Sequence, residues 1–246
     1  MSVPLHSVPI HIFIMCHNES LLLPHTIAHY RKYLPSASII VYDNESTDNS
    51  VGLATHLGCD VVSFTSNNIL NEYILQANRN ECWLSLTTGW VIIADMDEWL
   101  CVTEAELHAE YDAGTTLLTV KGYNMIGESQ LEDLSDIDLH AIRKAVYSSQ
   151  ESKQMCLLRD EIHKMNYLRG SHSCSPEGRV QYSTKTYVNK HIAILGIPYL
   201  IKKMLERYER THVMRQLGIS GHYINDIERI TRIYTDALAE AEVLEL

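Results

Sequence analysis

Residues 90–99 read Trp-Val-Ile-Ile-Ala-Asp-Met-Asp-Glu-Trp and predict an apolar strand that ends in two carboxylates, Asp95 and Asp97. Residues 90–94 are apolar throughout, which is typical of a central strand covered on both faces. The two acids are spaced i and i+2, so a turn must begin between them if both are to face one site. Paired oxygen ligands suit Mg²⁺ or Mn²⁺, and such an ion can neutralise a diphosphate. The alternative is a strand end with solvated acids.

Strand and helix patterns alternate upstream of this segment, with short links between them. This alternation predicts a parallel sheet with right-handed crossovers, whose ligands lie beyond the carboxyl ends of the strands. The pattern predicts strands at 11–16, 38–42 and 60–64, and helices at 21–32, 51–57 and 67–87.

The second half of the chain is less regular, and no linker separates two independent domains. Gly218 closes the first of two predicted C-terminal helices, and the second is amphipathic. The pattern predicts strands at 116–122, 153–159, 164–168 and 182–194, an acidic loop or short helix at 128–138, and helices at 198–217 and 224–238.

Two more polar clusters follow predicted strands. His17, Asn18 and Glu19 come after the first strand, and Asp43 and Asn44 come after the second. A carboxylate at such a position can accept hydrogen bonds from ribose hydroxyls. The alternatives are a helix cap for the first cluster and a polar turn for the second.

The charge of the chain is uneven. The 246 residues carry a net charge of −11, with 46% hydrophobic and 21% charged residues, which is ordinary globular composition. Residues 94–140 hold one basic and 12 acidic residues, whereas residues 141–218 hold 14 basic and six acidic residues. An acidic chain is a poor candidate for binding nucleic-acid polymers or anionic membranes. The basic segment could face a phosphate group.

The sequence shows no apolar run of roughly 18 residues and no cationic leader, which predicts a cytoplasmic protein without a transmembrane segment. The six cysteines include no C-x-x-C pair, which favours reduced thiols.

Taken together, these motifs resemble the GT-A glycosyltransferases, most closely the inverting family 2 enzymes. Asp95-Met96-Asp97 is similar to the DXD motif of that fold. Two later segments, Gly170-Ser171-His172 and Lys190-His191, resemble the late histidines of a family 2 subgroup that is similar to family 92 (DUF23-like). The matching segments are His17-Asn18-Glu19, residues 42–50, Asn78-Arg79-Asn80 and residues 95–99.

The resemblance implies a single GT-A domain over residues 1–246, with a Rossmann-like mixed sheet flanked by helices. Residues 1–100 would form the nucleotide-sugar-binding half, 101–197 the acceptor-side half and 198–246 the C-terminal helices. The reaction would move a sugar from a nucleotide sugar to a hydroxyl of a glycan or another molecule. The expected donor is a UDP-sugar. The C-terminal helices could cover the acceptor site or form a homodimer face.

The same resemblance implies roles for individual residues. Asp95 and Asp97 would hold Mn²⁺ or Mg²⁺, with Asp97 the stronger ligand and His172, or alternatively His191, as a third. The nucleotide sugar would contact His17, Asn18, Glu19, Asp43, Asn44, Arg79, Asp95, Met96 and Asp97.

An inverting transfer also needs a general base. The acidic pair that supplies it in many family 2 enzymes has no convincing counterpart here. Asp160, beside Glu161, is one candidate, and Glu128, with Glu132 and Asp133, is another; each is equally typical of a solvated loop.

Two other functions stay open. A non-catalytic carbohydrate- or nucleotide-sugar-binding protein on a degenerate transferase fold would agree with the missing base. A sugar nucleotidyltransferase shares the sheet topology, but the Gly-rich, Arg-containing loop expected after its first strand is replaced here by residues 16–19.

Overall fold

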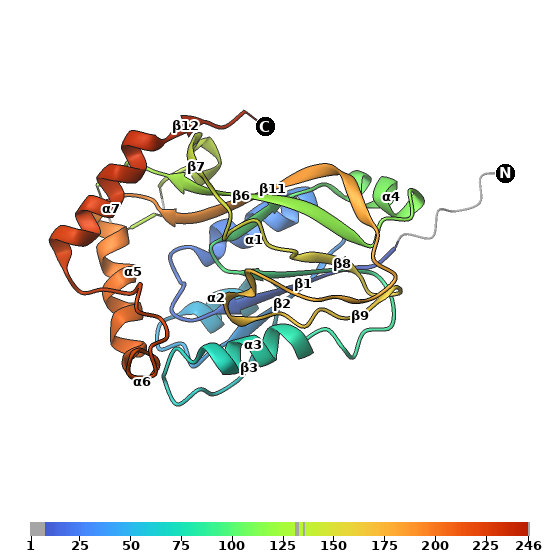
Figure 1. The fold of residues 1–246 in the computed structure, drawn as a ribbon, viewed down its shortest axis with the longest axis horizontal. Helices are drawn as coiled ribbons and strands as arrows, with labels where there is room; N and C mark the ends of the chain where they lie inside the picture. Colours follow the sequence, from blue (N-terminus) through green and yellow to red (C-terminus); the bar gives the residue numbers. More distant parts are fainter. Residues whose placement is uncertain (1–7, 131–132, 135, 246) are drawn as a thin grey trace.

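A mixed β-sheet flanked by helices organises the chain in the computed structural model, which describes residues 8–130, 133–134 and 136–245 (Figure 1). Ten strands of these residues form one sheet in the order β12-β7-β6-β8-β4-β1-β2-β3, with β11 pairing with β6 and β5 pairing with β11. Helices α5, α6 and α7 gather at one end (orange and red in Figure 1). The predicted α/β class, with a mixed sheet and C-terminal helices, is confirmed.

The first half is the parallel part of the sheet. β1 lies between β2 and β4 and runs parallel to both, and β3 extends the sheet beyond β2. In this register Met15 lies opposite both Tyr42 and Asp95, so three strands end side by side. The elements are β1 (Ile10–Cys16), α1 (Leu23–Tyr33), β2 (Ser38–Asp43), α2 (Ser50–His56), β3 (Asp60–Ser63), α3 (Glu72–Glu81) and β4 (Trp90–Asp95).

The second half completes the sheet with mostly antiparallel pairs. β8 is antiparallel to β4, and β6 is antiparallel to β7 and β8 but parallel to β11. The elements are β5 (Glu98–Cys101), α4 (Glu104–Asp112), β6 (Leu117–Ile126), β7 (Lys144–Ser148), β8 (Cys156–Leu158), β9 (Ile162–Lys164), β10 (Glu177–Gly178), β11 (Tyr182–Ile194), α5 (Ile197–Arg210), α6 (His212–Gln216), α7 (Ile227–Glu240) and β12 (Glu242–Val243), with 3-10 turns at Leu139–Ala141 and Arg169–Ser171.

Several predicted boundaries were wrong. The helix predicted at 67–87 spans only α3, because Asn67 and Asn68 adopt left-handed backbone conformations (φ 56° and 53°) and Asn71 caps the helix. The strand predicted at 164–168 overlaps β9 only at Lys164, and the helix predicted at 198–217 is divided at Thr211. The described residues of 128–138 contain no helix or strand.

The core surrounds the parallel strands, with Trp90, Ile92 and Ile14 almost completely buried. All six cysteines are free. Within the described ranges, no helix combines the length and the apolar character needed to span a bilayer.

Helix α1 holds the segment that follows β4. Thr26 Oγ1 donates to the carbonyl of Met96 (2.7 Å), Tyr30 Oη to the carbonyl of Glu98 (2.9 Å) and His29 Nε2 to the carbonyl of Leu100 (3.0 Å). The indole of Trp99 donates back to Thr26 Oγ1 and its ring stacks on that of His29. The backbone around Asp97 is therefore fixed from the N-terminal half of the chain.

His29 makes the stability of this support depend on pH. Burial lowers the pKa of His29 from 6.5 to about 3. Below pH 6.5 the unfolded chain takes up a proton that the folded chain does not, so stability present at pH 7 falls as the pH drops. Between pH 7 and pH 5 this residue alone is expected to cost about 2 kcal/mol.

Thermal unfolding of the wild type and of His29→Gln at pH 7, 6 and 5 measures this cost. The variant should be less stable at pH 7, because it loses the stacking on Trp99, but should lose less stability on acidification. Equal losses in the two proteins would contradict the assignment.

Candidate functional site

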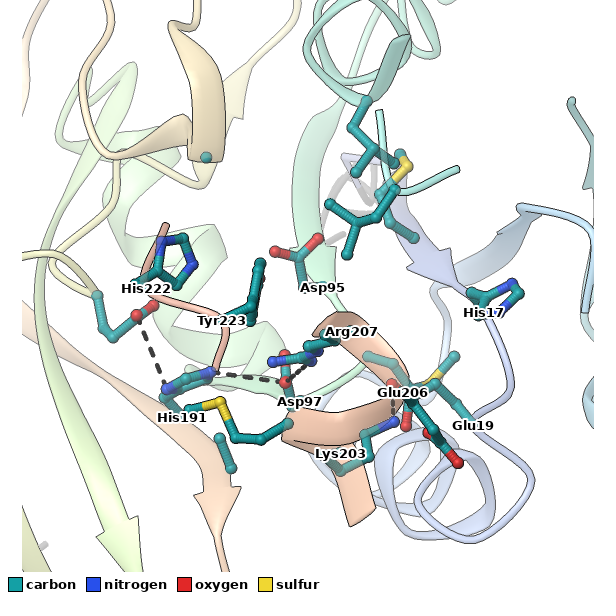
Figure 2. A pocket seen from close by; sticks show the side chains of 18 of the residues that line it. His17, Glu19, Asp95, Asp97, His191, Lys203, Glu206, Arg207, His222 and Tyr223 are labelled. Carbon is teal, nitrogen blue, oxygen red and sulfur yellow. Dashed lines mark hydrogen bonds and ion pairs between the residues drawn. The ribbon is translucent and has the colours of Figure 1, made fainter. Parts of the chain in front are cut away.

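A cavity of about 590 Å³ lies at the carboxyl ends of the parallel strands (Figure 2). Its volume is within the range of small-molecule sites. Its walls come from the ends of β1, β2 and β4, from α3 and β11, and from α5. The sequence-predicted residues that line it are His17, Glu19, Asn44, Arg79, Asp95, Met96, Asp97, His172 and His191.

Asp95 is the last residue of β4, and two cations hold it. Arg79 Nη2 lies 2.5 Å from Asp95 Oδ1, and Lys153 Nζ lies 3.7 Å from Asp95 Oδ2. Burial tends to raise the pKa of Asp95, but Arg79 and Lys153 lower it below its usual value. The carboxylate is therefore ionised, and its side chain is 27% exposed toward the cavity.

Asp97 lies in the turn between β4 and β5 and faces the same cavity, in agreement with the predicted turn between the two acids. Its Oδ2 lies 2.9 Å from Arg207 Nη2 and 3.5 Å from His191 Nε2. Although burial works against ionisation, His191 and Arg207 hold the pKa of Asp97 well below its usual range. Burial in turn lowers the pKa of His191, but Asp97 raises it above its ordinary value.

The donor set around Asp97 fits a metal ion that substrate oxygens complete. Asp95, Asp97 and His191 all line the cavity and offer oxygen and imidazole donors (Figure 2). Within the described part of the chain, no three His, Cys, Asp or Glu side chains are arranged as a ready-made metal cage. Mg²⁺-type sites commonly use one or two carboxylates plus substrate phosphates.

His172 does not join this group. It is exposed, and its Nδ1 donates to the carbonyl of Gln150 (2.8 Å). Of the two predicted histidines, the structure thus brings His191 to the carboxylates and leaves His172 on another part of the cavity wall.

The ends of β1 and β2 contribute His17, Glu19 and Asn44. His17 Nδ1 donates to the carbonyl of Asn44 (2.6 Å), and Arg210 Nη2 donates to Asn44 Oδ1 (2.7 Å). The Glu19 carboxylate lies 2.6 Å from Lys203 Nζ and is almost fully buried. This wall offers hydrogen-bonding groups held in place by α5.

Two predicted contacts lie outside the cavity wall. Asn18 has a left-handed backbone (φ 50°), and its Oδ1 accepts hydrogen bonds from the backbone N–H groups of Thr47 and Asp48. Asp43 is buried, and its Oδ2 accepts a hydrogen bond from the Ser46 N–H. Both side chains brace the loop after β2 and do not line the cavity.

The two candidate bases are also remote from it. Asp160 accepts from Thr88 Oγ1 and from the Gly89 N–H, just before β4 begins, whereas the cavity lies where β4 ends. Glu128 is exposed and pairs with Lys144. Asp133 does not line the cavity, and Glu132 lies outside the described residues. Asp160 and Glu128 therefore lie apart from the cavity, and a catalytic role for either of them stays a prediction.

Two groups of residues that line the cavity were not predicted from the sequence. Lys203, Arg207 and Arg210 are spaced i, i+4 and i+7 on α5, and this helical spacing of cations was the signal available. Glu151 and Lys153 come from the loop before β8 and showed no pattern of their own. Lys153 Nζ lies 2.6 Å from Glu98, and burial raises the pKa of Glu98 to about 7 despite this partner.

Comparisons with known proteins return neighbours of low similarity only. No family model matches the chain. Protein RfbJ of Shigella flexneri is 38% identical over 58 residues, which are 24% of this chain and 45% of that protein.

Three solved structures share part of the arrangement. The mannosyltransferase PcManGT of Pyrobaculum calidifontis, in complex with GDP-Man and Mn²⁺, is 15% identical with a TM-score of 0.37, over 48% of this chain and 36% of that one. Glucosyl-3-phosphoglycerate synthase of Mycobacterium tuberculosis, with Mn²⁺ and UDP, is 19% identical with a TM-score of 0.33, over 47% and 44%. S. aureus TarS is 11% identical with a TM-score of 0.45, over 94% and 43%. The chain spans less than half the length of each of these proteins.

Proposed function

We propose that the chain is a metal-dependent glycosyltransferase of the GT-A type, which moves a sugar from a nucleoside-diphosphate sugar to an acceptor hydroxyl. The observation that supports this most is the cavity at the strand ends. Asp95 and Asp97 enter it from β4, and arginines from α3 and α5 face them. Carboxylates for a divalent cation beside guanidinium groups for phosphate form the donor set that a metal–diphosphate complex requires.

The charge of the cavity favours a donor that brings its own cation. Five Lys or Arg and six Asp or Glu side chains line it, so the charges of its side chains nearly balance. A diphosphate alone would add uncompensated negative charge to partly buried surroundings. A diphosphate with Mn²⁺ or Mg²⁺ adds little net charge, which supports a divalent cofactor at Asp95 and Asp97, with His191 as the imidazole ligand.

The nucleoside is expected at the ends of β1 and β2, where His17, Glu19 and Asn44 offer donors and acceptors for the base and ribose. The sugar would then lie toward α5 and β11. For the proton acceptor of an inverting transfer we add Glu151 to the candidates, because Asp160 and Glu128 do not line the cavity. It lines the cavity, is buried, and its Oε1 lies 3.7 Å from His191 Nδ1.

Calorimetric titration with a panel of UDP- and GDP-sugars tests this function. We expect binding in the presence of Mn²⁺, and at least about tenfold weaker binding after the metal is removed with EDTA, because the diphosphate then meets Asp95 and Asp97 directly. No binding by any nucleotide sugar, or equal binding with and without metal, would contradict the proposal.

Turnover separates the alternatives. Release of a nucleoside diphosphate supports a transferase, whereas release of pyrophosphate from a nucleoside triphosphate and a sugar phosphate would indicate a nucleotidyltransferase. Metal-dependent binding without any turnover over a panel of acceptors would favour the non-catalytic reading.

A further inference from the structure

Arg207 links the C-terminal helix α5 to the carboxylate that is the stronger metal-ligand candidate. Its Nη2 donates to Asp97 Oδ2 at 2.9 Å, the oxygen that also faces His191 Nε2 (Figure 2). The Asp97 side chain is only 6% exposed, so its negative charge requires a cationic partner when no metal is bound. Beside His191, Arg207 supplies such a partner from a position 110 residues further along the chain.

Asp95 has a comparable partner that is much less free to move. The Arg79 side chain is 8% exposed and Lys153 adds a second cation, whereas the Arg207 side chain is 30% exposed. Among the described residues, the Arg207 guanidinium makes one hydrogen bond, to Asp97. A guanidinium has five N–H donors, so most of those of Arg207 are available to another anion.

The neighbours of Arg207 on α5 fix the helix rather than the carboxylate. Lys203 pairs with Glu19 and Arg210 donates to Asn44, so α5 is attached to the ends of β1 and β2 on either side of Arg207. The Arg207 side chain can therefore change partner while the helix remains in place. The ring of Tyr223 lies 5.9 Å from its guanidinium carbon and limits the space that it can sample.

We propose that Arg207 is an exchangeable counter-ion. It neutralises Asp97 in the empty protein, and when a divalent cation binds Asp97 it turns to the diphosphate of the donor. This inference rests on the proposed function. A guanidinium and a divalent cation at the same oxygen repel each other. A phosphate can accept two hydrogen bonds from one guanidinium, in a bidentate pair, whereas a metal-bound carboxylate cannot.

The exchange predicts opposite effects of one substitution on two ligands. Arg207→Met in the full chain should bind Mn²⁺ alone about tenfold more tightly, because the competing cation is gone. At saturating Mn²⁺ the same variant should bind UDP and GDP about tenfold more weakly, because a phosphate contact is lost. Arg229→Met, on the exposed side of α7, is the matched control and should change neither affinity.

Mn²⁺ binding is measured by electron paramagnetic resonance of the free ion, and nucleotide binding by calorimetry. Arg207→Lys keeps the positive charge and checks for a purely structural effect: it should retain Mn²⁺ binding close to the wild type while binding UDP and GDP more weakly. Weaker or unchanged Mn²⁺ binding by Arg207→Met, or unchanged nucleotide binding, would overturn the exchange. If the wild type itself bound neither Mn²⁺ nor nucleotide, the proposed function would fail, and this inference with it.

Discussion

Replacing Asp97 with Asn is expected to lower the rate of sugar transfer about a thousandfold, because loss of a metal ligand removes several kcal/mol of charge stabilisation in the transition state. The substitution keeps the shape of the side chain but removes its charge. It leaves Arg207 and His191, at 2.9 and 3.5 Å, without their carboxylate. Steady-state kinetics with Mn²⁺ and the best nucleotide sugar measures the effect.

Asp60→Asn provides the matched control, since Asp60 is an exposed acid at the start of β3, away from the cavity. It should leave the rate within twofold of the wild type, and circular dichroism should show that both variants are folded. Full activity of a folded Asp97→Asn protein would exclude Asp97 as a metal ligand.

Replacing Lys153 with Met is expected to destabilise the protein by about 3–5 kcal/mol, the usual cost of removing one partner from a buried ionic cluster. Lys153 Nζ lies 2.6 Å from Glu98, 3.5 Å from Glu151 and 3.7 Å from Asp95, and its side chain is 7% exposed. Burial lowers the pKa of Lys153, but these carboxylates raise it far more, so the ammonium is charged. Urea unfolding at pH 7 measures the loss.

Lys164→Met serves as the control, because Lys164 pairs with Glu177 on the exposed surface. This substitution should lower the free energy of unfolding by less than about 1 kcal/mol. The variants also differ in their response to acid. Burial already raises the pKa of Glu98 to about 7, and without Lys153 this carboxyl group holds its proton more tightly still in the folded state. Lys153→Met should therefore recover, relative to the wild type, part of its lost stability as the pH falls from 7 to 5. A loss that does not depend on pH would indicate a packing defect instead.

The parallel half of the sheet could be predicted because its signals are local. Residues 90–94 are apolar without interruption, and the strand–helix alternation before them fixes both the class and the edge where the strands end. That rule alone placed His17, Asn44 and Asp95 at one edge, and the register of β1 with β2 and β4 confirms it. Asn18 and Asp43 also follow strands but do not line the cavity, because both side chains bind the loop after β2; their contact with a nucleotide stays a prediction.

The rest of the site depends on contacts between distant segments. β5 is four residues long and exists by pairing with β11, some ninety positions away, so nothing in its own sequence predicted it. The role of Lys153 as the partner of Glu98 depends on the fold, which brings these two distant residues together. The spacing of Lys203, Arg207 and Arg210 predicted that they share one face of a helix. It did not predict which part of the protein that face contacts.

The most direct test of the central claim is a crystal structure of the chain with Mn²⁺ and its best-binding nucleotide sugar. Anomalous scattering from manganese would locate the metal without assumptions about the protein. We expect a single peak within about 2.4 Å of an Asp97 oxygen and of the donor diphosphate, with the nucleoside at the ends of β1 and β2. A nucleotide bound elsewhere, or bound in this cavity with no metal at Asp97, would contradict it.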